Sequence, residues 1–121
     1  MKQCLILLLA IFVTGCMSNP RIEDLSSSNR AKAASLQIFQ GATDRPHEIV
    51  GQVTGLSCNR NKYQVQNISD AEALQGIRIN AARLGADAVI NTFCQTNSDT
   101  DWRNNCWASI KCVGDAIRYT D

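Results

Sequence analysis

The pattern of apolar and polar positions divides the chain into an apolar start, a polar segment and a folded part. Residues 4–13, CLILLLAIFV, form an uninterrupted apolar run, whereas residues 17–35 are polar, contain a serine triplet and show no apolar periodicity. From Leu36 onward, apolar residues recur at spacings typical of strands and helices. We therefore expect one folded domain over residues 36–121, preceded by a flexible tether, with one or two helical turns over residues 30–35 as the alternative at the end of the tether.

The clearest element in the folded part is a helix that begins after Ser69. Ser69 and Glu72 have the spacing of a capping box, in which each side chain accepts the backbone N–H of the other residue. Gly85 follows as a helix stop. Gly76, inside the helix, costs roughly 1 kcal/mol relative to alanine and indicates close packing. One apolar stripe is predicted at helical spacing: Leu74, Ile77, Ala81 and Leu84.

Four segments have the composition of strands: residues 35–40, 47–58, 86–94 and 106–120. In the second, Gly51 and Gly55 indicate a bulge or close packing. Alternation in the third puts Ala88, Ile90, Thr92 and Cys94 on one face, and Val89, Asn91 and Phe93 on the other. In the last, Ala108, Ile110 and Cys112 share a face. The element order predicts an α+β fold, a small sheet of about four strands (β-β-α-β-β) with one packed helix.

Charge excludes one class of partner. The 121-residue chain carries a formal charge of +1, and removing residues 1–15 takes away Lys2 alone and leaves 11 basic against 11 acidic residues. A neutral chain with scattered charges has no electrostatic footprint for nucleic acid. The sequence also contains no glycine-rich phosphate loop. We expect no nucleic-acid partner, no small-molecule substrate and no cofactor.

The apolar start has the shape of a secretory signal peptide. Lys2 precedes ten apolar residues, whereas a transmembrane helix needs about 20. The following VTGC, residues 13–16, resembles the lipobox of bacterial lipoproteins, in which cleavage precedes a lipid-bearing cysteine. We expect a signal peptide over residues 1–15 and lipidation of Cys16; a retained anchor and an ordinary signal peptide are the alternatives. Several acyl chains would anchor the protein stably, and Met17 in place of aspartate favours the outer membrane.

Four cysteines remain in the domain: Cys58, Cys94, Cys106 and Cys112. In a small exported domain, four thiols indicate two disulfides, for which the sequence allows three connectivities. Cys106 and Cys112 would lie about 20 Å apart on an extended strand, too far for a disulfide. A simple hairpin favours Cys94–Cys106, and a shifted pairing of the strands favours Cys94–Cys112. Periodicity leaves both open.

Other chemistry has little support. The cysteines lack the paired spacing of zinc modules and the C-x-x-C motif of redox proteins. His47 has no nucleophile suggested near it, and Asp99 and Asp101 lie in a polar loop where we expect them to be solvated. Trp102 and Trp107 flank Cys106, and we expect them to pack against a disulfide, with a partner-binding patch as the alternative. No metal site and no enzymatic activity are expected.

Four segments together resemble the RcsF family, outer-membrane lipoprotein sensors of the Rcs envelope-stress phosphorelay. They are the lipobox, GQVTGLSC (51–58), IRINAARLGADAVINTFC (77–94) and NCWASIKCVGDAI (105–117). The likeness covers essentially the whole folded part, and all four domain cysteines fall at corresponding points. The segment LGADAVI alone also resembles a family of small cytoplasmic domains of unsettled function, which lack the export signal and the disulfides.

This resemblance implies a disulfide pairing and a set of partners. It implies the bonds Cys58–Cys106 and Cys94–Cys112. It also implies a protein held by Cys16 in the outer membrane, with its domain in the periplasm or partly surface-exposed. Such proteins bind outer-membrane β-barrel proteins and the barrel-assembly machinery, and under stress they engage an inner-membrane negative regulator of the phosphorelay. A partner switch of this kind needs no catalytic residue.

One departure from the family concerns the length of the tether between the lipid and the domain. Enteric members carry a longer, proline-rich tether, whereas Pro20 is the only proline in the tether expected here. Residues 17–35 would extend to about 60–65 Å at most. The resemblance thus implies an envelope-stress signalling lipoprotein, with a structural or barrel-assembly accessory lipoprotein as the alternative.

Overall fold

The computed structural model describes residues 21–61 and 67–121, so that the predicted signal peptide, Cys16 and the centre of the loop after Asn59 lie outside the described residues. Within these ranges the order is η1, α1, β1, β2, α2, β3 and β4. The bounds are η1 Ile22–Asp24, α1 Ser27–Ser35, β1 Gln37–Ile38, β2 His47–Asn59, α2 Asp70–Arg83, β3 Ala88–Asn97 and β4 Ala108–Tyr119. The predicted α+β class is confirmed.

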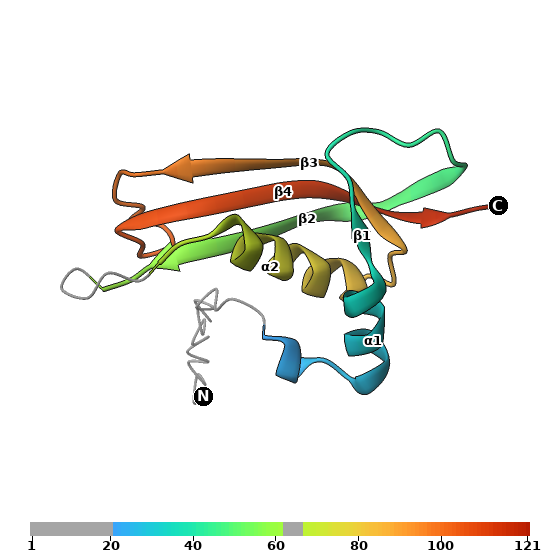
Figure 1. Cartoon of the computed structure of the whole chain (residues 1–121), viewed down its shortest axis with the longest axis horizontal. Helices are drawn as coiled ribbons and strands as arrows, with labels where there is room; N and C mark the ends of the chain where they lie inside the picture. Colours follow the sequence, from blue (N-terminus) through green and yellow to red (C-terminus); the bar gives the residue numbers. More distant parts are fainter. Residues whose placement is uncertain (1–20, 62–66) are drawn as a thin grey trace, which may run out of the picture.

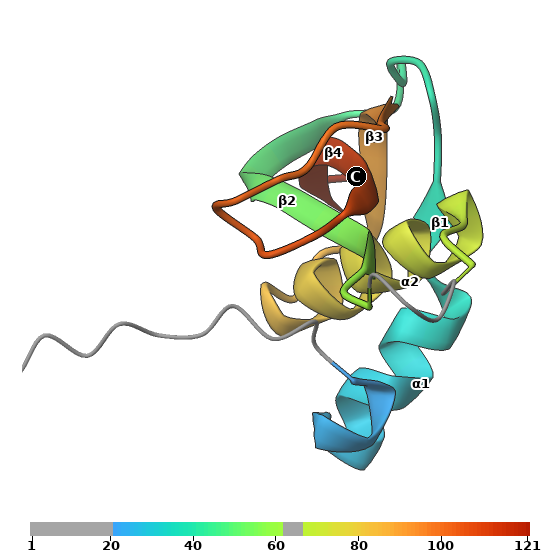
Figure 2. The same ribbon diagram turned by 90° about the vertical axis from the view of Figure 1, so that its left-hand side faces the viewer.

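The described strands form one mixed sheet in the order β1-β3-β4-β2, covered on one face by α2 (Figure 1). β1 runs parallel to β3, while β4 pairs antiparallel with both β3 and β2. The short α1 packs against α2 on the side away from the sheet (Figure 2). The result is a sheet with α2 on one face and α1 behind it, and not the sheet and single helix that we expected.

The core lies between α2 and the sheet and depends on two glycines. Gly55 of β2 and Gly76 of α2 face each other; a Cβ on Gly76 would lie 3.1 Å from the Cα of Gly55. The predicted close packing at Gly76 is therefore confirmed. The cluster of buried residues around this crossing contains Leu36, Val53, Ala73, Ile77, Ala81, Ala86, Val89, Ile110, Cys112 and Ala116.

The predicted stripe of α2 is wrong at its last position. Ile77 and Ala81 are buried, but Leu84 is 42% exposed because the helix ends at Arg83 and Leu84 is its C-cap. Gly85 follows with a φ of +71°, as expected for the residue that ends a helix.

Residues 22–35, which we expected in the tether, are folded onto the domain. Ser26 caps α1 by accepting the backbone N–H of Asn29. Leu25 and Ala33 are buried against α2, and Lys32 donates a hydrogen bond to the carbonyl oxygen of Gly85. The sequence concealed this docking because these few apolar residues are small or widely spaced, so that they give no periodic signal.

The predicted faces of β3 hold only as far as Ile90. A bulge between Ile90 and Phe93 shifts the register against β4, and Asn91 within it has a φ of 53°. The extra residue reverses the alternation after it. Cys94 therefore joins the α2-facing cluster with Val89, not the opposite cluster that contains Ile90.

The capping box at the start of α2 is completed by a residue from β2. Ser69 accepts the backbone N–H of Glu72, as predicted. The reciprocal bond is relayed: the backbone N–H of Ser69 donates to Ser57 Oγ at 2.9 Å, and that hydroxyl donates to a carboxylate oxygen of Glu72 at 3.1 Å. Ser57 is fully buried, so this relay ties the helix start to the sheet.

Replacing Ser57 with alanine should therefore destabilise the fold. Ser57→Ala removes both bonds and leaves the N–H of Ser69 without its partner, at a cost of about 1–3 kcal/mol. Urea unfolding of the full chain measures this difference. The matched control is Ser35→Ala, whose exposed hydroxyl donates only to the carbonyl oxygen of Lys32. Equal midpoints for the two variants would show that the relay contributes nothing.

Candidate interaction surfaces

Two disulfides join the described cysteines on opposite faces of the sheet. Cys58 is bonded to Cys106 and Cys94 to Cys112, the pairing implied by the resemblance. Gly55 lies opposite Cys112 in the register and shares its face with Ser57, so the next residue, Cys58, points to the other face. One disulfide thus lies under α2, and the other holds a loop against the uncovered side.

The path of the loop after β3 explains why the simple hairpin pairing does not occur. Cys94 lies directly opposite Cys112, with a Cα–Cα distance of 4.0 Å. The loop between β3 and β4 then reaches across to β2, where the backbone N–H of Trp107 donates to the carbonyl oxygen of Asn59. Cys106 therefore lies beside Cys58, 48 residues away in sequence.

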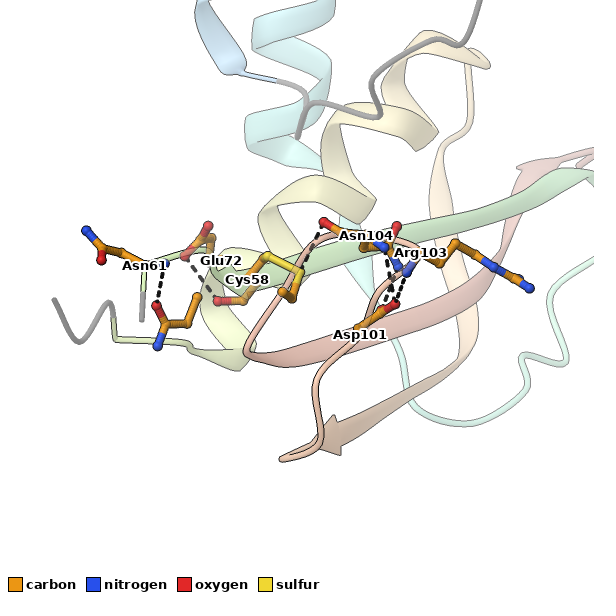
Figure 3. The surroundings of a disulfide bond; sticks show 9 residues. Cys58, Asn61, Glu72, Asp101, Arg103 and Asn104 are labelled. Atoms are coloured by element: carbon orange, nitrogen blue, oxygen red, sulfur yellow. Dashed lines mark hydrogen bonds between the residues drawn. A yellow bond between two sulfur atoms is a disulfide. The ribbon is translucent and has the colours of Figure 1, made fainter. Parts of the chain in front are cut away.

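Asp101 orders the tip of this loop (Figure 3). One of its carboxylate oxygens accepts the backbone N–H groups of Arg103 and Asn104, and the other accepts the side-chain amide of Asn104 at 2.8 Å. Backbone bonds between Asp101 and Cys106 close the turn. We had expected a solvated carboxylate; the structure uses it to fix the turn before the Cys58–Cys106 disulfide.

The same bonds predict how the loop responds to acid. The hydrogen bond from the Asn104 side chain, followed by those from backbone N–H groups, lowers the pKa of Asp101 below its ordinary value of 3.8. Because the folded-state pKa is lowered, the contribution of Asp101 is complete above pH 3.8 and is lost as the pH falls through the lowered pKa. NMR titration of the Arg103 and Asn104 amides should show this acid step, and Asp101→Asn should abolish it. An unchanged step in that variant would contradict the assignment.

The expectation that both tryptophans pack against the disulfide is wrong for Trp102. Its side chain is 82% exposed, because it follows Asp101 at the tip of the turn. Trp107 is 38% exposed and lies directly before β4. Trp102 is thus the most exposed of the large apolar side chains in the described residues.

The other candidate residues are not brought together. His47 begins β2, and its Nδ1 lies 2.7 Å from the carbonyl oxygen of Arg45. Asp99 is exposed, and its backbone N–H donates to the Asn97 side chain. Over residues 21–61 and 67–121, no three His, Cys, Asp or Glu residues are grouped to hold a metal ion. No helix in these ranges is long and apolar enough to span a membrane.

A groove that the sequence did not predict lies between α2 and β3. It has a volume of about 550 Å³ and is lined on the helix side by Asp70, Leu74 and Arg78. Ile38 of β1 and Cys94 of β3 also line it. No local pattern signals it: the strand predicted over residues 35–40 is only two residues long in the structure, and so it cannot cover its ten-residue neighbour β3.

Comparison with known proteins supports the fold alone. No protein-family model matches the chain, and no curated protein matches it. Among solved structures, it is similar to a DUF74-family protein of unknown function from Pediococcus pentosaceus ATCC 25745, with a TM-score of 0.54 and 16% sequence identity. The similarity covers 69% of this chain and 97% of that chain. The α+β arrangement is thus seen in a solved structure, without an assigned activity.

Proposed function

We propose that this protein is an RcsF-like lipoprotein that senses envelope stress and activates an Rcs-type phosphorelay by protein–protein contact. In this proposal Cys16 carries the lipid anchor in the outer membrane. The partners are outer-membrane β-barrel proteins with the barrel-assembly machinery, and an inner-membrane regulator. The protein acts by exchanging partners and makes or breaks no covalent bond.

The observation that supports the proposal is the connectivity of the disulfides. Joining the first domain cysteine to the third and the second to the fourth is the pattern that the RcsF resemblance implies, and Cys58–Cys106 and Cys94–Cys112 follow it. Disulfides persist in oxidising compartments. The connectivity therefore agrees with both the resemblance and an exported domain.

The docking of α1 shortens the link between lipid and domain. Six residue steps separate Cys16 from Ile22, where η1 begins, and six steps span at most about 20–22 Å. Residues 17–35 were expected to reach about 60–65 Å. In the proposal, the domain stays close to the lipid surface while α1 is docked, so that the inner-membrane partner must approach it. This short link favours the second candidate, a barrel-assembly accessory lipoprotein that acts beside the outer membrane.

Lipidation has a direct test. Cys16→Ala should release the full chain from the membrane fraction, because the thiol that carries the lipid is lost. The check is fractionation of cells followed by immunodetection, with the wild-type chain as the reference. Persistent membrane association of the variant would count against lipidation at Cys16.

Deletion of the gene separates the two candidate functions. In the host, loss of the protein should abolish induction of an Rcs-type reporter under envelope stress, and the wild-type gene should restore it. Unchanged induction would exclude the signalling function. If induction were unchanged and barrel-protein levels in the outer membrane fell, the accessory function would be supported instead.

A further inference from the structure

The outer edge of β3 is paired for only part of its length. β1 pairs with β3 through Gln37–Ala88 and Ile38–Val89, and the chain after β1 continues to bond as far as Thr92, whose N–H donates to the carbonyl oxygen of Phe39. β3 runs on to Asn97. Within residues 21–61 and 67–121, no backbone group pairs with this side of residues 93–97.

The distance between the disulfide-bonded strands shows which backbone groups face the open side. The Cα atoms of Cys94 and Cys112 are 4.0 Å apart, which marks a pair that is not hydrogen-bonded across the ladder. The N–H and C=O of Cys94 therefore point away from β4. The register continues without a shift to Thr96–Ile110, so Thr96 has the same orientation. Cys94 and Thr96 thus present donors and acceptors to an added strand.

This edge lacks two of the features that usually prevent pairing with another chain, a proline and a charged side chain. The segment FCQTN, residues 93–97, contains no proline and no charged residue. The disulfide to Cys112 holds the segment extended, so that little ordering is needed on binding. An extended, uncharged and rigid edge of this kind is a template for a further strand.

The groove between α2 and β3 adjoins this edge. Cys94 contributes to both. Leu74 and Ile38 give the groove an apolar part, beside the charged Asp70 and Arg78 of α2. A strand added beside β3 would point alternate side chains to the α2 side of the sheet, over this groove. Backbone pairing together with pockets for alternate side chains is the usual mode of strand addition.

We propose that the β3 edge at residues 93–97 binds an extended segment of a partner protein that carries large apolar side chains at alternate positions. A second copy of the chain fits less well. On the groove side, its own β3 would offer Cys94, held in a disulfide, and Thr96, and these small side chains leave a groove of about 550 Å³ largely unfilled. This inference deepens the proposed function by naming the surface that contacts a partner.

Site-specific photocrosslinking on the full-length protein in intact host cells tests the inference. Benzoylphenylalanine replaces Gln40, an exposed residue that lines the groove. We expect adducts that mass spectrometry maps to an extended partner segment with large apolar residues at alternate positions. Adducts with a second copy of the chain would overturn the inference. So would adducts with lipid alone, or the absence of any protein adduct.

Substitutions at Thr96 provide the matched controls. Thr96→Pro removes the outward N–H and should lower adduct yield about tenfold or more, whereas Thr96→Val keeps that N–H and should retain the yield. Thr96→Lys, which adds a charge to the edge, should also lower the yield, and covers the case in which the proline variant fails to fold. Equal yields from Thr96→Lys and Thr96→Val would contradict the inference. Crosslinks report contact directly, so an unresponsive stress reporter would not affect this result.

Discussion

Removing the Cys58–Cys106 disulfide should lower the free energy of unfolding by about 4 kcal/mol. This loss should be larger than the one caused by removing the Cys94–Cys112 disulfide. In the chain-entropy account, a disulfide restricts the unfolded chain more strongly when it closes a longer loop. Cys58–Cys106 spans 48 residues and Cys94–Cys112 spans 18. The same relation gives about 3 kcal/mol for the shorter loop.

The measurement is urea unfolding of two paired variants of the full chain. One carries Cys58→Ala with Cys106→Ala, and the other carries Cys94→Ala with Cys112→Ala. Alanine is chosen because Cys112 is fully buried, and a serine there would add a polar group without a partner. A clearly larger loss from the Cys94–Cys112 variant would show that packing under α2 outweighs loop entropy. When both disulfides are removed, a domain of this size should be largely unfolded at 37 °C.

Gly55→Ala should be the most damaging single substitution among the described glycines. A Cβ at Gly55 would overlap the carbonyl oxygen of Ala73 and lie 2.8 Å from its carbonyl carbon. Both atoms belong to the backbone of α2, so relief requires the helix to move away from the sheet. Overpacking of this kind costs typically 1–3 kcal/mol and occasionally more, and backbone contact puts this case at the upper end.

Gly41→Ala is the matched control for that substitution. A Cβ at Gly41 would have no neighbour within 4 Å, and surface changes of this kind stay within about 0.5 kcal/mol. Thermal unfolding of the two variants provides the comparison. If Gly55→Ala melted at the temperature of Gly41→Ala, the close approach of β2 and α2 would not be needed for stability.

The sequence predicted those parts of the fold that a local pattern specifies. The start of α2 was predictable because Ser69 and Glu72 carry the signature of a cap, and the end because Gly85 follows. The four strand regions were predictable from their apolar composition. The pattern could not predict the bulge at Asn91. Asparagine tolerates the positive φ found there, but the order of apolar and polar residues around Asn91 does not show that one residue of the strand is extra.

The parts that could not be predicted depend on contacts between distant segments. Ser57 looks like an ordinary strand residue, and its role in the cap exists only because β2 passes the start of α2. Leu25 and Ala33 are buried only because α2 offers Ile79 and Ala82 on its outer side. The open edge of β3 follows from the short pairing with β1, which the composition of neither strand reveals.

These distant contacts change the functional interpretation in one respect. The resemblance implies a lipoprotein that reaches its partners through a tether, but residues 22–35 belong to the folded part. In the proposal that Cys16 carries the lipid, a link of at most about 20–22 Å would hold the domain beside the lipid surface. Contact at the β3 edge and at the Trp102 loop would then take place next to that surface, and a stress signal would have to bring the regulator to it.

In the proposed function, the protein exchanges partners under envelope stress. The most direct measurement is photocrosslinking of the full-length protein in intact cells before and after stress, with the crosslinker at Gln40 and, separately, at Trp102, the most exposed tip. We expect adducts with an outer-membrane barrel protein before stress, and we expect them to give way to adducts with an inner-membrane protein after stress. The same adducts in the same proportions under both conditions would contradict the proposal.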